Sequence, residues 1–172
     1  MDQFGGYALK MVGQQQKVYD AENEFCGFID NAWQSPLVQL GPVAVLVPAE
    51  RKFRSVNEVN MFIVELGRRL SFHAPRVVGK VGQEYALYDP STHVMAIPSG
   101  GHWALRETVI LHELSHAVSQ DRDSAGHGPK FTRTFLNIID VIMGDDAALL
   151  MTALYRKHGV RVAEVSHWIE KK

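Results

Sequence analysis

The stretch LHELSHAV, at residues 111–118, is the part of the sequence that decides how the fold is interpreted. It contains the pattern H-E-x-x-H, formed by His112, Glu113 and His116, within a run of apolar residues typical of a buried helix. Residues four apart lie about 6 Å apart along one face of a helix, so both imidazoles can bind one metal ion. Glu113 lies about 100° around the helix, where its carboxylate can reach a water bound to that ion. The stretch therefore predicts a metal centre on a helix.

A third ligand distinguishes a metal centre from a solvated helix face that carries two histidines. His127 suits this role, since ten residues separate it from His116 and glycines flank it in the segment AGHGP, residues 125–129. The glycines allow a loop to fold back toward the helix. Three neutral imidazoles leave the fourth tetrahedral position to water, which is typical of catalytic zinc sites. We therefore predict one Zn²⁺ per chain, bound by His112, His116 and His127, because imidazole ligands favour zinc.

The motif and its continuation resemble the SprT-like zinc metallopeptidases, the family that includes Spartan. That family's pattern is H-E-x-x-H-A, then an acidic linker, then H-G-x-x-F. It is matched here by HELSHA at residues 112–117, DRD at 121–123 and HGPKF at 127–131. The chain is also similar to a small group of metallohydrolases from actinobacteria and their phages, which leaves a phage origin open.

The SprT-like resemblance implies a compact zincin fold and a zinc-dependent metallopeptidase, in which His112, His116 and His127 hold the zinc ion and Glu113 is the catalytic base. Peptide-cleaving zincins bind substrate as an added strand along the sheet edge that precedes the active-site helix. By analogy this edge is expected near His93–Ile97, with a paired interior strand as the alternative. Three histidines and a glutamate do not specify a substrate. Hydrolysis of a non-peptide amide or ester, or a non-catalytic structural or interaction protein that binds zinc, therefore remain as other hypotheses.

The order of the periodic patterns predicts an α+β architecture, with a small antiparallel sheet packed on the HExxH helix and further helices. Helices are expected at residues 7–33, 55–70, 103–119, 130–143 and 145–158. Strands are expected at residues 43–47, 76–81, 84–88, 93–97 and 160–165. Ser55 and Glu58 have the spacing of a capping box. A segment rich in proline and glycine after residue 35 predicts an N-terminal helical arm at 1–35 and a zincin-like metallohydrolase domain at 36–172.

Composition limits the classes of function. The 172 residues include 18 basic and 19 acidic side chains, and this balance does not indicate a nucleic-acid or membrane-surface binder. The single cysteine, Cys26, excludes an internal disulfide and a four-cysteine zinc site. The first residues do not resemble a secretion signal, and no apolar stretch approaches membrane-spanning length, so we expect a cytoplasmic protein. The oligomeric state stays open.

Other polar residues have both a functional and a simpler interpretation. His102 can stabilise an oxyanion or start a helix, and Tyr155 can act as an electrophile or fill the core. Asp121, Asp123 and Asp140 can orient a zinc-bound imidazole, although solvated turn positions are the default for the two loop aspartates. The remaining histidines lack a partner at helical spacing and are expected at the surface: His73, His93, His158 and His167.

Overall fold

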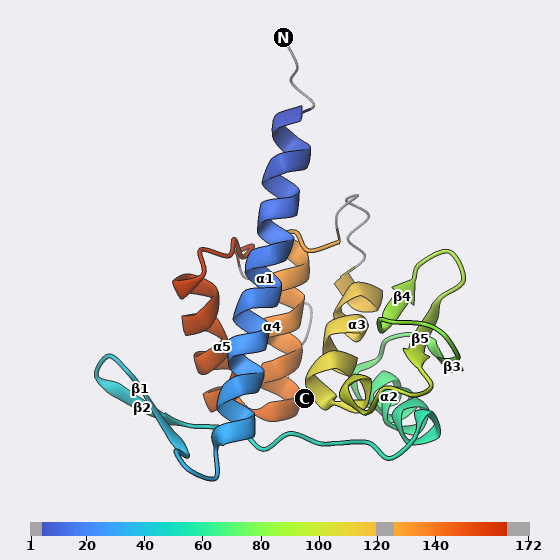
Figure 1. Cartoon of the computed structure of the whole chain (residues 1–172), viewed down its shortest axis with the longest axis horizontal. Helices are drawn as coiled ribbons and strands as arrows, with labels where there is room; N and C mark the ends of the chain where they lie inside the picture. Colours follow the sequence, from blue (N-terminus) through green and yellow to red (C-terminus); the bar gives the residue numbers. More distant parts are fainter. Residues whose placement is uncertain (1–4, 120–125, 165–172) are drawn as a thin grey trace. The chain divides into compact units, whose positions relative to one another are not determined.

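Figure 1 shows the computed structural model of the chain, which describes residues 5–119 and 126–164. Within these residues α-helices are combined with two small sheets, so the expected α+β class is confirmed. The chain divides into two units, one formed by Met1–Ala49 with Asp121–Lys172 and the other by Glu50–Gln120. The division after Ala49 lies beyond the boundary expected at residue 35, and the first unit includes the C-terminal helices. Among the described helices, none has the length and apolar character needed to cross a membrane.

The first unit is built around helix α5 (Asp145–Lys157), which packs against α1 (Gly5–Asn31), α4 (Pro129–Met143) and strand β2 (Val43–Leu46). Strand β1 (Leu37–Leu40) pairs antiparallel with β2. Figure 1 shows α5 beside α1 and α4. The apolar faces of the elements meet in a core of aliphatic and aromatic side chains. Its members include Val18, Phe25, Val45, Phe131, Phe135, Ile139, Leu150, Met151 and Tyr155.

Polar contacts connect α1 to the C-terminal part of its unit. The Gln14 side-chain amide donates to the Arg161 carbonyl (2.9 Å) and accepts from the Arg161 N–H (3.1 Å). Further along α1, the Glu24 carboxylate binds Lys157 (2.6 Å) and His158 (2.8 Å). These two hydrogen bonds, the one from Lys157 above all, lower the pKa of Glu24. The N-terminal helix is thus a packed part of the first unit.

The strand expected at residues 160–165 is absent from its described part, residues 160–164. The backbone groups of this segment bond to the first turn of α4 instead of to a neighbouring strand. The Arg161 carbonyl accepts from the Thr132 hydroxyl (2.8 Å), and the Ala163 N–H donates to the carbonyl of the first residue of α4 (2.9 Å). The prediction is wrong because β-branched residues indicate an extended segment, and an extended segment needs no sheet when other partners bind its backbone.

The strand expected at residues 43–47 is present as β2, and β1 is an additional strand that pairs with it. Leu40 stands opposite Val43, so the two strands are joined by a two-residue turn, Gly41-Pro42. Gly41 has a φ of +60°, in the left-handed region that glycine adopts without strain. β1 lies between Pro36 and Pro42, and because proline is uncommon inside sheets, the sequence of this segment predicts a loop.

The second unit contains helix α2 (Val56–Leu70), the 3-10 helix η1 (His102–Leu105) and helix α3 (Glu107–Ser119), which carries the H-E-x-x-H motif. α2 begins where the capping-box spacing predicts, since the Ser55 hydroxyl accepts a hydrogen bond from the Glu58 N–H (3.2 Å). α3 is buried on almost every side along its first nine residues, and its buried residues include those of the motif. Buried polar groups need partners, so the surroundings of α3 decide what the motif can do.

The sheet of the second unit differs from the expected antiparallel meander. Its strands are β3 (Arg76–Lys80), β4 (Leu87–Asp89) and β5 (Val94–Pro98), in the order β3-β5-β4. β5 runs parallel to β3 and antiparallel to β4, so the strand expected at the edge, near His93–Ile97, lies in the middle. That prediction is wrong because β5 is mostly buried and apolar and is paired on both sides, whereas the shorter, more polar β4 takes an edge.

Candidate metal centre

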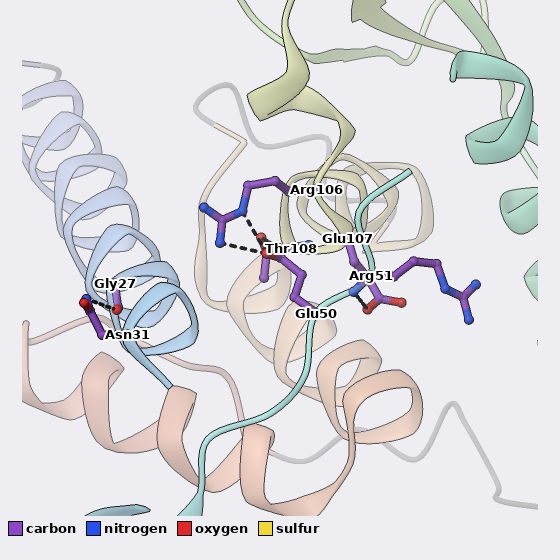
Figure 2. Close-up of polar contacts among 7 residues, drawn as sticks. All are labelled: Gly27, Asn31, Glu50, Arg51, Arg106, Glu107 and Thr108. Atoms are coloured by element: carbon purple, nitrogen blue, oxygen red, sulfur yellow. Dashed lines mark hydrogen bonds and ion pairs between the residues drawn. The ribbon is translucent and has the colours of Figure 1, made fainter. Parts of the chain in front are cut away.

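A carboxylate from a distant part of the second unit fixes the start of α3 (Figure 2). The side chain of Glu50 is 1% exposed and forms an ion pair with the Arg106 guanidinium (2.7 Å). It also accepts hydrogen bonds from the Thr108 N–H (3.1 Å) and from the Thr108 hydroxyl. Negative charge is favourable at a helix N-terminus because the first N–H groups have no partner within the helix. Glu50 therefore caps the helix that carries the motif.

The segment that follows Glu50 runs beside the first turn of α3. The Arg51 N–H donates to the Glu107 carboxylate (3.0 Å), and the Glu107 N–H donates to the Arg51 carbonyl (2.9 Å), as Figure 2 shows for the first of these bonds. The Phe53 N–H donates to the Leu105 carbonyl (2.9 Å). Burial raises the pKa of Glu107, against the opposing effect of the hydrogen bond from Arg51. α3 thus begins at a position fixed by several bonds from one extended segment.

His112 and His116 have the spacing of two ligands of one metal ion. Their Nε2 atoms are 3.3 Å apart and their ring centroids 5.0 Å apart. Two nitrogens that each lie about 2.0–2.1 Å from a tetrahedral zinc ion are separated by about 3.3 Å. His112 is buried and His116 half-buried, so α3 holds the pair at the boundary between the interior and the surface. The helical spacing inferred from the sequence therefore brings two imidazole nitrogens to the separation that one metal ion requires.

Glu113 is buried next to this pair, and its carboxylate is bonded to the sheet. Its Oε2 atom accepts a hydrogen bond from the main-chain N–H of Tyr88 in β4 (2.8 Å). Tyr88 in turn bonds through its hydroxyl to Nδ1 of His93 (2.7 Å). The carboxylate that the motif assigns to proton transfer is therefore held by a specific donor at the sheet edge.

His127 belongs to the first unit, where aromatic rings surround it just before α4. It is 6% exposed, and its ring contacts Tyr19 of α1 and Phe131 of α4 edge-on, with centroid distances of 5.0 and 4.9 Å. Gly126 has a φ of +67°, which explains the glycine before the histidine. Pro129 occupies the first turn of α4, as the sequence predicts. Gly126 and Pro129 thus suit the backbone of the loop on either side of His127.

The three histidines share the chemistry of a ligand set. Each of His112, His116 and His127 offers one imidazole nitrogen that could bind a metal ion, the first two in the second unit and the third in the first unit. Glu113, which follows the first of them, is a carboxylate that the Tyr88 N–H already binds on one oxygen.

The structure also shows the burial and the contacts of the other polar residues singled out from the sequence. Tyr155 is fully buried with its hydroxyl 3.3 Å from Glu22, and burial raises its pKa well above the usual value, so it is a core residue. His102 is exposed on η1 and Asp140 half-buried in α4. The expectation that His93 is a plain surface residue is wrong, because it is half-buried and bonded to Tyr88. His158 is likewise half-buried and bonded to Glu24 (2.8 Å), so the same expectation is wrong for it, whereas His73 is exposed as predicted. Asp121, Asp123 and His167 lie outside the described residues.

Three residues that contact α3 or a candidate histidine have no signal in the sequence. Glu50 lies 58 residues before Thr108, so no local pattern relates them. Tyr88 contributes a main-chain N–H, which no residue type reveals. Tyr19 stands in the middle of α1, and only the folded arrangement of the first unit places its ring beside His127.

Comparison with known proteins identifies no relative of this chain. No protein-family profile, curated protein or solved structure matches it.

Proposed function

We propose that this protein is a single-zinc hydrolase of the zincin type, and that it cleaves peptide bonds. The observation that carries the proposal is the 3.3 Å separation of the His112 and His116 Nε2 atoms, because it equals that of two imidazole ligands of one zinc ion. The resemblance of residues 112–131 to the SprT-like metallopeptidases supports the same assignment and supplies His127 as the third ligand.

The donor set fits zinc, since three neutral imidazoles favour this ion and leave one coordination position for water. Bound there, the ion would lower the pKa of a water molecule and polarise the scissile carbonyl group. The Glu113 carboxylate accepts the proton of the attacking water and then delivers it to the leaving nitrogen. Burial of Glu113 suits this role, because a carboxylate removed from bulk water interacts more strongly with the reacting groups. A structural zinc site has no use for such a carboxylate.

A hydrolase of a small amide or ester is a second candidate, and the sheet supports it. A peptide that adds a strand to a sheet needs a run of outward N–H and C=O groups along the edge. β5 is an interior strand, and the edge strand bonded to Glu113 is only three residues long, Leu87–Asp89. A substrate recognised through its side groups rather than through a long backbone ladder suits such an edge.

The decisive test is the metal content of protein purified without added metal, measured by mass spectrometry. We expect about one zinc per chain in the wild type, largely lost from His127→Ala after washing with a mild chelator. Glu113→Gln is the matched control, because it keeps all three imidazoles and should keep the zinc. Absence of zinc from the wild type, or full retention in His127→Ala, would contradict the three-histidine site.

Activity is then measured with pools of internally quenched fluorescent peptides, and with a panel of aryl esters and anilides as small substrates. We expect hydrolysis by the wild type and none by Glu113→Gln. Peptide cleavage favours the leading proposal, and hydrolysis confined to the small panel favours the second candidate. Stoichiometric zinc with no hydrolysis of either panel would indicate a non-catalytic zinc protein.

A further inference from the structure

We propose that the main-chain N–H of Tyr88 is a positioning group for catalysis, which holds the Glu113 carboxylate in the orientation that proton transfer requires. This inference rests on the proposed function, because it gives Tyr88 a role only if Glu113 is the base. Its starting point is the 2.8 Å hydrogen bond from the Tyr88 N–H to Oε2 of Glu113.

The register of the sheet explains why this N–H is directed at α3. Tyr88 stands opposite Met95 of the neighbouring antiparallel strand β5. N–H groups alternate between the two sides of a strand, so a Tyr88 N–H that faces Glu113 places those of Leu87 and Asp89 toward β5. Pro90, the next residue, has no N–H. Tyr88 is therefore the residue of β4 that directs its amide away from the sheet.

The rest of Tyr88 is anchored, so its amide is held in place. Its hydroxyl bonds to Nδ1 of His93 (2.7 Å), and the His93 ring stacks on His73 with centroids 4.6 Å apart. The neighbouring Asp89 carboxylate accepts three hydrogen bonds from the turn that follows it, at 2.6–2.9 Å. Tyr88 is therefore held by the pairing of β4 with β5, by the hydrogen-bonded turn that follows Asp89, and by the bond between its hydroxyl and His93.

A fixed donor matters for a base because a carboxylate on a glutamate side chain otherwise samples several rotamers. A hydrogen bond to a charged acceptor is stronger than one between neutral groups, and it restricts the carboxylate to one orientation. Ordering the base before the reaction removes that ordering from the activation barrier. The Tyr88 contact therefore acts on the rate of the chemical step and not on zinc or substrate binding.

The contact itself is tested first, without metal or substrate, by amide hydrogen exchange in ¹⁵N-labelled protein. In wild-type protein we expect the Tyr88 amide to be protected, and in Glu113→Ala to exchange at least about 10-fold faster. The amides of Leu87 and Asp89, which face β5, are internal controls and should keep their protection. Equal Tyr88 exchange in both proteins overturns the inference.

The role in catalysis is tested by comparing Tyr88→Pro with Tyr88→Ala. Both variants lack the ring, and only proline lacks the N–H. Proline is tolerated on an edge strand where the N–H points away from the sheet. We expect the kcat of Tyr88→Pro to be about 10- to 100-fold below that of Tyr88→Ala on the best substrate from the screen, with similar KM and zinc content. If proline disturbs folding, an ester in place of the peptide bond before residue 88 removes the same donor and keeps the tyrosine ring.

The outcomes separate the two proposals. Equal kcat values for the proline and alanine variants, or for the ester and the wild type, overturn the positioning role while the wild type remains an active hydrolase. A fall in zinc content or a rise in KM in step with kcat also overturns it, since the contact would then be a structural one. A wild type without zinc or without hydrolysis overturns the proposed function, and the positioning role with it.

Discussion

The two regions that carry the candidate ligands hold their histidines in different ways. On α3, helical spacing sets the His112–His116 pair, and hydrogen bonds fix the start of the helix and the Glu113 carboxylate. In the first unit, His127 lies in a loop and is packed against the rings of Tyr19 and Phe131. Local geometry determines the first arrangement, whereas the second depends on packing between helices. From this difference we predict that the His112–His116 pair supplies most of the zinc affinity. The contribution of His127 to that affinity should depend on the rings packed against it.

The largest effect is expected from removal of one member of the α3 pair. His112→Ala should abolish measurable zinc binding, whereas His127→Ala should keep a weak site, roughly 100-fold or more below wild-type affinity. Titration with zinc in the presence of a chromophoric chelator measures both affinities. Equal residual binding in the two variants would show that His112 and His127 contribute equally to the zinc affinity. Far-ultraviolet circular dichroism checks that each variant remains folded.

The hydrogen-bonded start of α3 makes the second unit sensitive to Glu50. Glu50→Ala removes a buried carboxylate that forms an ion pair with Arg106 and accepts hydrogen bonds from Thr108, and should lower the free energy of unfolding by about 3–5 kcal/mol. Urea denaturation measures the loss. The matched control is Glu65→Ala, which removes a carboxylate that is paired with Arg68 at the surface. The Glu65 side chain is 60% exposed, so its loss should lower the free energy of unfolding by less than about 1 kcal/mol. Similar losses for both variants would refute the capping role.

The packed surroundings of His127 should influence zinc more than stability. Tyr19→Ala removes the ring that contacts His127 and should weaken zinc binding by about 2- to 10-fold, the energy of one aromatic contact. The ring is retained in Tyr19→Phe, which should bind zinc with nearly wild-type affinity. An unchanged affinity in Tyr19→Ala would show that the loop alone positions His127.

The smallest effect is expected on the pH dependence of stability, from the hydrogen-bonded turn at Asp89 after β4. Hydrogen bonds from Ser91 and Thr92 lower the pKa of Asp89 from 3.8 to about 2. Because the folded-state pKa is the lower one, ionised Asp89 stabilises the fold above about pH 4, and this contribution disappears as the pH falls through 2. The stability difference between wild type and Asp89→Asn should therefore shrink between pH 5 and pH 2. Urea denaturation at several pH values measures it, and a pH-independent difference would contradict the assignment.

The elements that the sequence predicts well are those defined by local signals. The boundaries of α4 follow from Pro129 and the apolar period after it, and α2 starts at the Ser55 cap. The close approach of the His112 and His116 imidazoles on α3 follows from their spacing of four residues. Each of these features is encoded within one or two helical turns.

The features that could not be predicted depend on contacts between distant segments. The strand order is an example, because local alternation identifies β4 and β5 but does not show which one pairs with β3. The packing of α1 into the first unit is another, since it depends on Gln14 and Glu24 meeting residues more than 130 positions away. The donor to Glu113 is a main-chain group, which any residue except proline can supply.

The cap at the start of α3 has a consequence for how the protein folds. Glu50 and Thr108 are 58 residues apart, and their contact closes a loop that contains α2 and the whole three-stranded sheet. Closing a loop of this length is entropically costly and slow compared with the formation of a helical turn. During synthesis the contact cannot form until the segment with Thr108 has emerged. Helix α3 should therefore be among the last elements of its unit to become ordered, after α2 and the β4–β5 hairpin.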